Sequence, residues 1–279
     1  MISAKLFFET SVILGAAQYK LLESNNYLKM DIEKGLISKP ERYKHSYELI
    51  EYVMKKKGEL DPFVSYGVKR EIRNLLQKKE QLEKKIIEKL KLPKRISKLP
   101  IEDKKVFDYL LFQIFFVKFP SITYDILDQF GSIAVDDVSV EGLRDELFSK
   151  IFKPLKIRQD YLIDYFERKG VNEGFLIKDK DYPEYQNLKK LLEPFYKFGN
   201  YKKINDLRIL AEAIYCYNKM KDELKITPTF YFVSCDHIFI PFRGSDDQTF
   251  FKVHNEIKAY YGLEPITPKE FLLRASSTD

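Results

Sequence analysis

Two acidic residues of this chain stand directly after apolar runs, where a charge needs an explanation. Glu9 follows Ala4–Phe8, and Asp236 follows Thr229–Cys235. An uncompensated carboxylate at the end of a central strand is costly, so a cation or hydrogen bonds must offset its burial. In open α/β sheets, ligands bind at the carboxyl ends of the strands. The two residues therefore predict a charged site at that edge of a sheet.

Two further acids lie in the first turns of predicted helices. Glu71 follows one apolar helical position by three residues and precedes another by four, so it lies on or beside the buried face. Asp206 opens an amphipathic helix. A parallel sheet would deliver all four carboxylates to one edge, where they repel one another unless a divalent cation neutralises them. Hard oxygen donors favour Mg²⁺ or Mn²⁺.

Each acid also has a purely structural interpretation. Glu9 and Asp236 would stabilise turns by accepting hydrogen bonds from nearby backbone amides. Glu71 would interact favourably with the helix dipole, and Asp206 would be an N-cap, the commonest role of an Asp at a helix start. These alternatives stay open for each residue alone. The argument for a site comes from the four positions taken together.

The elements that must position these acids alternate between strands and helices at both ends of the chain. Hydrophobic periodicity predicts a parallel sheet covered on both faces, an α/β fold. The expected strands are Ala4–Phe8, Asp61–Ser65, Ile133–Val135, Thr229–Ser234 and Glu264–Ile266. The expected helices are Val12–Leu22, Pro40–Lys57, Tyr66–Leu90, Lys104–Val117, Ser139–Phe152, Ile157–Arg168, Glu184–Phe198, Ile204–Met220, Gln248–Tyr261 and a last helix that Thr267, Pro268 and Glu270 begin with a capping box.

This pattern predicts a discontinuous core, 1–76 with 201–279, and a mainly helical insertion, 77–200. The chain carries 48 Lys and Arg against 42 Asp and Glu, a net charge of +6 that suits a polyanionic partner. That excess is concentrated between Lys78 and Lys105, where eleven basic residues face five acids. A stretch of this kind either follows a nucleic-acid backbone or forms a long solvated helix.

The remaining composition indicates a folded chain in a reducing compartment. Cys216 and Cys235 have no zinc-ligand spacing, and the three histidines, His45, His237 and His254, form no ligand pair. No apolar stretch is long enough to span a bilayer. We therefore expect a cytoplasmic protein without membrane contact, whose metal ligands are oxygen atoms.

The motifs around the four acids resemble those of the PIN domain family of metal-dependent nucleases. An apolar strand leads into Glu9-Thr10-Ser11, where the family normally has Asp-Thr-Ser or Asp-Thr-Asn, and Asp206 opens a helix that continues as Leu210-Ala211-Glu212-Ala213. The other matching motifs are Val64-Ser65 followed by Glu71-Ile72, Val233-Ser234-Cys235-Asp236, and the closing segment Tyr261–Phe271. The likeness covers about 1–75 and 201–275 and leaves the middle unexplained.

The resemblance implies a PIN-like three-layer α/β/α core and hydrolysis of RNA phosphodiester bonds with Mg²⁺ or Mn²⁺. Glu9, Glu71, Asp206 and Asp236 would be the catalytic metal ligands, supported by the hydroxyls of Thr10, Ser11 and Ser234. The expected substrate is single-stranded RNA, with phosphates bound by Arg70, Arg208 and Arg243; surface ion pairs are the alternative role of these arginines.

The main rival is a catalytically inactive adaptor on the same scaffold, which binds nucleic acid or protein. Glu9 is one methylene longer than the Asp that the family has at this position, so its carboxylate must sit differently to reach the same metal. The helical insertion offers a surface for a protein partner, and a homo-oligomer is compatible with the sequence. Metal binding distinguishes the nuclease from the adaptor.

Overall fold

The computed structural model of the chain describes residues 4–24, 41–74, 76–77, 119–154, 204–225, 229–235 and 248–277. Three predicted helices, Lys104–Val117, Ile157–Arg168 and Glu184–Phe198, lie outside these ranges, as does the basic stretch Lys78–Lys105. Within the described part of the chain, no helix is both long and apolar enough to cross a membrane.

A five-stranded sheet, parallel throughout, forms the centre of the fold. Its strands are β1 (Ala4–Phe8), β2 (Leu60–Ser65), β3 (Gly131–Ile133), β4 (Phe230–Val233) and β5 (Glu264–Ile266), in the spatial order β3-β2-β1-β4-β5. β1 is central because Phe7 pairs with Phe63 of β2 on one side and with Phe232 of β4 on the other. The predicted α/β class and parallel sheet are confirmed.

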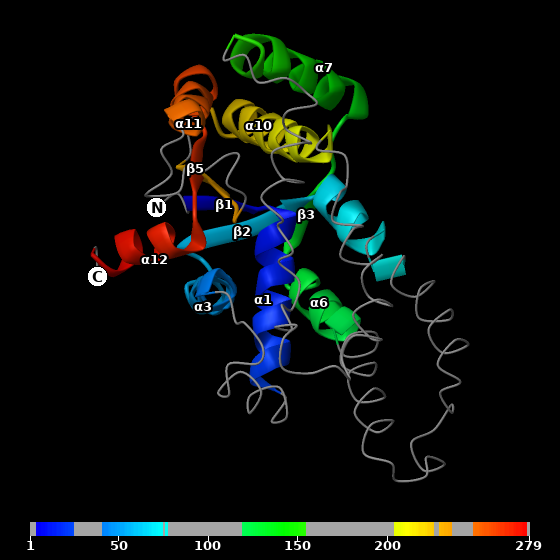
Figure 1. Cartoon of the computed structure of the whole chain (residues 1–279), viewed down its shortest axis with the longest axis vertical. Helices are drawn as coiled ribbons and strands as arrows, with labels where there is room; N and C mark the ends of the chain where they lie inside the picture. The colour runs from blue at the N-terminus through cyan, green and yellow to red at the C-terminus, as the bar shows by residue number, and fades with distance from the viewer. Residues whose placement is uncertain are drawn as a thin grey trace, which may run out of the picture.

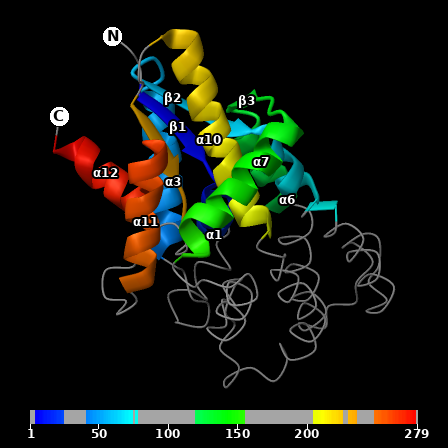
Figure 2. The same cartoon turned by 90° about the horizontal axis from the view of Figure 1, so that it is seen from above.

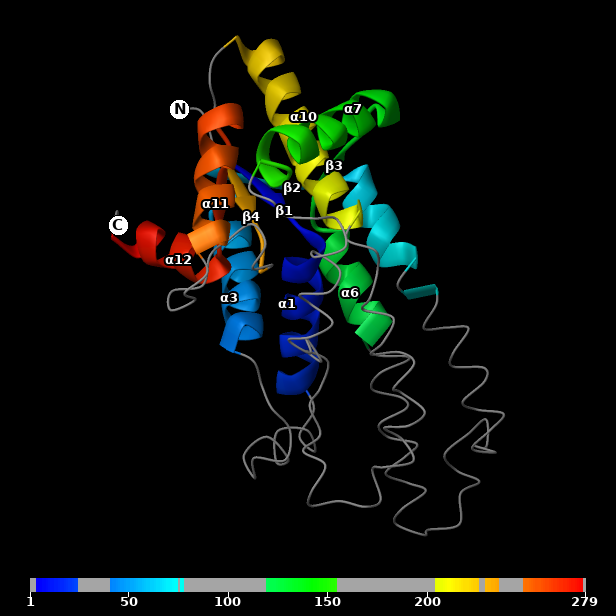
Figure 3. The same cartoon turned by 45° about the horizontal axis from the view of Figure 1, so that its top comes forward.

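Helices cover both faces of this sheet (Figures 1 and 3). On one face, α1 (Thr10–Glu23) packs against α3 (Glu41–Lys55) and α6 (Phe119–Leu127). On the other face, α10 (Ile204–Leu224) packs against α7 (Asp137–Leu147), and α11 (Gln248–Tyr261) contacts the π-helix η3 (Phe148–Phe152). The last helix, α12 (Pro268–Ser276), packs on α3 and begins with the predicted capping box.

The hydrophobic core lies between the sheet and these helical layers. Phe7, Phe8 and Phe232 of the two central strands are fully buried, and Phe7 stacks on Phe232 with ring centroids 5.7 Å apart. Because both faces are covered, the central strands are apolar almost throughout, without the alternation of a half-exposed sheet. Gly58, in the turn between α3 and β2, has a φ of 112°, which favours glycine.

The segment 119–154 belongs to the same folded body as the sheet. β3 pairs with β2, and α6 packs on α1. α7 packs on α10, as Figure 2 shows from above. The sequence pattern placed this segment inside the helical insertion 77–200. The sequence did not reveal that the segment joins the sheet, because β3 has only three residues, two of them exposed, and carries almost no hydrophobic signal.

The strand order reverses direction beside β1. From β1 the chain moves to β2 and β3 on one side, and then returns to place β4 and β5 on the other. The carboxyl ends of β1 and β4 thus meet at a topological switch point, the place where open α/β sheets bind ligands.

Candidate metal centre at the carboxyl edge of the sheet

Glu9 occupies the switch point. It follows the last residue of β1 and is 8% exposed. Its carboxylate caps α1 by accepting a hydrogen bond from the Ser11 amide at 2.9 Å, and it also accepts one from the Ser11 hydroxyl. The Ser234 hydroxyl, at the end of β4, donates to the same oxygen at 3.3 Å. Groups from two neighbouring strand ends therefore fix this carboxylate.

Ser11 joins the start of α1 to the chain that leaves β4. A serine hydroxyl donates one hydrogen and accepts others; that of Ser11 donates to Glu9 and accepts from the Cys235 amide at 3.0 Å. The Ser234 amide donates to the Ile266 carbonyl of β5 at 3.1 Å. The backbone preceding Asp236 is thus anchored beside Glu9, while Asp236 itself lies outside the described residues.

Glu71 is attached to the same place through Thr10. The Thr10 hydroxyl donates to Oε2 of Glu71 at 2.5 Å, and Thr10 is 5% exposed. Glu71 lies on the helical stretch 66–74 that follows β2 directly. Thr10 directly follows Glu9, so the start of α1 holds the carboxylates of both Glu9 and Glu71. The structure thus brings two of the four predicted acids to one edge.

Asp206 lies in the first turn of α10, and its side chain is outside the described part of the structure. Among the described side chains, no three acids, histidines or cysteines gather closely enough to hold a metal ion. The described groups at the edge, the carboxylates of Glu9 and Glu71 and the hydroxyls of Thr10, Ser11 and Ser234, all present oxygen atoms. Their chemistry fits a hard divalent cation.

A second buried acid, Glu212, was not predicted from the sequence. It is fully buried in α10, and Oε2 accepts a hydrogen bond from the hydroxyl of Ser65, the last residue of β2. Ser65 also accepts from the Val68 amide at 3.1 Å. A Cβ atom on Gly67 would lie 2.0 Å from the Glu212 carboxylate, so a side chain there would displace that carboxylate.

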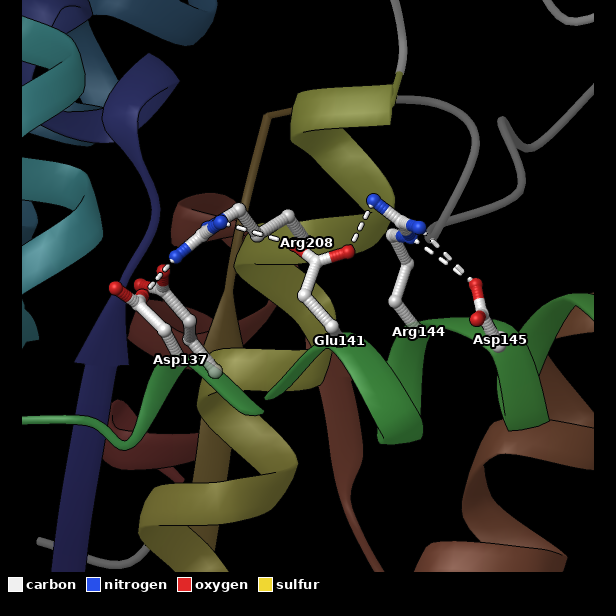
Figure 4. Close-up of polar contacts among 6 residues, drawn as sticks. Asp137, Glu141, Arg144, Asp145 and Arg208 are labelled. Atoms are coloured by element: carbon white, nitrogen blue, oxygen red, sulfur yellow. Dashed lines mark hydrogen bonds and ion pairs between the residues drawn. The ribbon is translucent and has the colours of Figure 1, made fainter. Parts of the chain in front are cut away.

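Arg208 compensates the buried charge of Glu212. Its Nε lies 3.2 Å from Glu212, one helical turn away, and its terminal nitrogens pair with Glu141 at 2.9 Å and with Asp137. Figure 4 shows Arg208 reaching from α10 toward α7, where Arg144 pairs with Glu141 as well. Burial lowers the pKa of the Arg208 guanidinium, but Glu212 and Asp137 outweigh this and raise it. Arg208 therefore holds α7 on α10.

The sequence carries a signal for Glu212. In the run from Ile209 to Ile214 it is the one charged residue, flanked by Ala211 and Ala213. A carboxylate within an apolar run has to be buried or break the helix packing, and an arginine four residues earlier is placed to pair with it. Its partner from β2, by contrast, becomes evident only from the fold.

The three arginines predicted to bind substrate have different positions. Arg70 is exposed on the helical stretch 66–74, Arg208 is engaged by three carboxylates, and Arg243 lies outside the described residues. For Arg208 the ion-pair alternative describes the observed contacts. Phosphate binding by Arg70 and Arg243 stays a prediction.

Fold and site together define a class: an α/β protein with an acidic, hydroxyl-rich cluster at the carboxyl edge of a parallel sheet. Comparisons of the chain with protein-family models, with curated proteins and with solved structures gave no match.

Proposed function

We propose that this protein is a metal-dependent endoribonuclease with a PIN-like fold, which hydrolyses phosphodiester bonds of RNA. The observation that carries the proposal is the meeting of Glu9 and Ser234 at the switch point, with Glu71 attached through Thr10. The all-parallel sheet with helices on both faces supports the PIN-like assignment.

In this proposal four acids hold Mg²⁺ or Mn²⁺: Glu9, Glu71, Asp206 and Asp236. The hydrogen bonds from Ser11 and Ser234 orient the Glu9 carboxylate, and the one from Thr10 orients Glu71. Fixed carboxylates lose little conformational entropy on binding a cation. When bound, the metal would acidify water and stabilise negative charge on the scissile phosphate.

The decisive experiment combines cleavage with metal binding. We expect the purified protein to cut fluorescent single-stranded RNA with Mn²⁺ or Mg²⁺, and EDTA and Asp206→Asn each to abolish the cleavage. By calorimetry, Asp236→Asn should lose Mn²⁺ binding. Equal cleavage by the Asp206→Asn variant and the wild type would reveal a contaminating nuclease and remove the proposal.

One observation favours a second candidate, an inactive adaptor on the same scaffold. Glu9 caps α1, so it has a structural role that needs no metal. A folded protein that binds RNA and shows no heat of Mn²⁺ binding would support the adaptor and exclude the nuclease.

A further inference from the structure

The helical stretch 66–74 has one buried face and one outward face. Val68 and Ile72 are completely buried in the core. Tyr66, Arg70 and Arg73 are exposed, Tyr66 to 54%. The spacing of these three residues, four and then three positions, places them on one side of a helix. We call these three residues the outward stripe.

The outward stripe is positively charged. Among the described residues, no ion pair or side-chain hydrogen bond engages Arg70 or Arg73, whereas Arg208 pairs with three carboxylates. Placing two guanidinium groups one turn apart on an exposed face contributes little to folding. Such a face is complementary to a polyanion.

The stripe begins at the carboxyl edge of the sheet. Tyr66 follows Ser65, the residue that ends β2, and Glu71 stands beside Arg70 in the same helix. Figure 1 shows this helix, in cyan, leaving β2 on the β3 side of the sheet. Glu71 turns inward from this helix, where the Thr10 hydroxyl holds it. A ligand that follows the stripe to Tyr66 therefore reaches the carboxyl end of β2, the strand beside β1.

We propose that the outward stripe binds single-stranded RNA: a base stacks on the Tyr66 ring, and Arg70 and Arg73 contact phosphates of the same strand. The inference rests on the proposed function, because it assigns the strand-binding surface of that site. Aromatic stacking with basic contacts to the backbone is the usual chemistry of single-strand binding, and a base inside a duplex does not present its face to a side chain.

The test measures affinity separately from cleavage. A short fluorescent oligouridine is titrated with protein in EDTA, and anisotropy is followed over a range of salt concentrations. Tyr66→Ala should weaken binding at least about fivefold without changing the salt dependence, because stacking is not ionic. Arg70→Gln with Arg73→Gln should make the slope of log affinity against log salt shallower by about 1.4, the value for two phosphate contacts.

Matched variants control for exposure and charge. Tyr260 is 57% exposed and lies at the end of α11, which leads to the amino end of β5, so Tyr260→Ala should bind as the wild type. Lys219→Gln with Lys221→Gln removes the same charge from the end of α10. It should leave the salt slope unchanged. Tyr66→Phe keeps the ring and should retain wild-type affinity.

The outcomes separate this inference from the proposed function. If the stripe variants bind RNA with wild-type affinity, or if the matched controls lose as much affinity, the stripe does not bind RNA. This conclusion holds even if the protein cleaves RNA. Stacking on Tyr66 is overturned if Tyr66→Ala leaves the affinity unchanged, or if it lowers the affinity for duplex RNA as much as that for a single strand. Stripe-dependent binding without Mn²⁺-dependent cleavage supports the stripe and removes the nuclease. No binding of RNA by the wild type removes both.

Discussion

Two buried glutamates, Glu9 and Glu212, show different ways of holding a carboxylate inside one protein. Glu212 is fully buried in the middle of α10, and an arginine one turn away supplies the opposite charge. Glu9 lies at a strand end, where its hydrogen bonds include an amide and two serine hydroxyls, and the next residue holds a further acid, Glu71.

This difference is the basis for assigning Glu212 to the fold and, in the proposed function, Glu9 to a metal ion. An internal ion pair is complete once the chain has folded. Carboxylates that are held close together repel each other, and a bound cation relieves that repulsion. We therefore expect changes around Glu212 to alter stability, and changes around Glu9 to alter activity.

The largest expected effect is on stability, in the Glu212 cluster. Arg208→Met keeps most of the side-chain volume but leaves Glu212 buried without its cation. The free energy of unfolding in urea should fall by about 3 kcal/mol. Adding Glu212→Gln should recover part of that loss, because the double variant has no buried charge. Strictly additive losses would show that the two side chains do not act as a pair.

An effect on activity of similar size is expected at Glu9. Glu9→Gln keeps the length of the side chain and can still accept the capping hydrogen bond, so stability should change by less than about 1 kcal/mol. RNA cleavage should fall by about 100-fold, because the proposed metal site loses one of its negative charges. A variant that unfolds more easily while cutting RNA normally would contradict the division between the two glutamates.

Shortening the same side chain tests its geometry. Glu9→Asp keeps the charge, but its carboxylate withdraws by one methylene from the hydrogen bonds of Ser11 and Ser234. Cleavage should fall about 10-fold, which is less than for the neutral variant. A gain in rate would show that the longer acid handicaps the site instead of fitting it.

Much of the fold could be predicted from the sequence because the central strands and amphipathic helices carry strong local signals. β1, β5 and α11 begin and end where periodicity placed them. α6 was not predicted, since Pro120 in its first turn resembles a helix breaker although proline is tolerated there. β3 begins at Gly131, two residues before the predicted strand, because a short edge strand has little apolar pattern to fix its bounds.

The candidate site was predictable in part for the same reason. Glu9 and Glu71 were identified by an acid following a strand and an acid on an apolar helical face, both of which are local patterns. The contact of Glu212 with Ser65 joins residues 147 positions apart, and no local pattern encodes it. Strand order decides which distant residues meet, and a single sequence specifies that order only through the complete fold.

The smallest expected effects come from two buried serines, one in each cluster. Ser65→Ala removes the hydrogen bond to Glu212 and leaves the Val68 amide without its acceptor, so stability should fall by about 2 kcal/mol. Ser234→Ala removes a long hydrogen bond, of 3.3 Å, to Glu9, and should cost less than about 1 kcal/mol. For the rate of RNA cleavage, Ser234→Ala should have the larger effect of the two. Ser234→Ala should lower the rate about fivefold at saturating Mn²⁺, because the Glu9 carboxylate loses one of its constraints, whereas Ser65→Ala should stay within about twofold of the wild type.

Urea unfolding and single-turnover cleavage of the two variants, measured side by side, check the order of the stability losses and the order of the rate losses. If Ser65→Ala were the variant with the slower cleavage and unchanged stability, then Glu212 would belong to the site, and the distinction between the two buried glutamates would be lost.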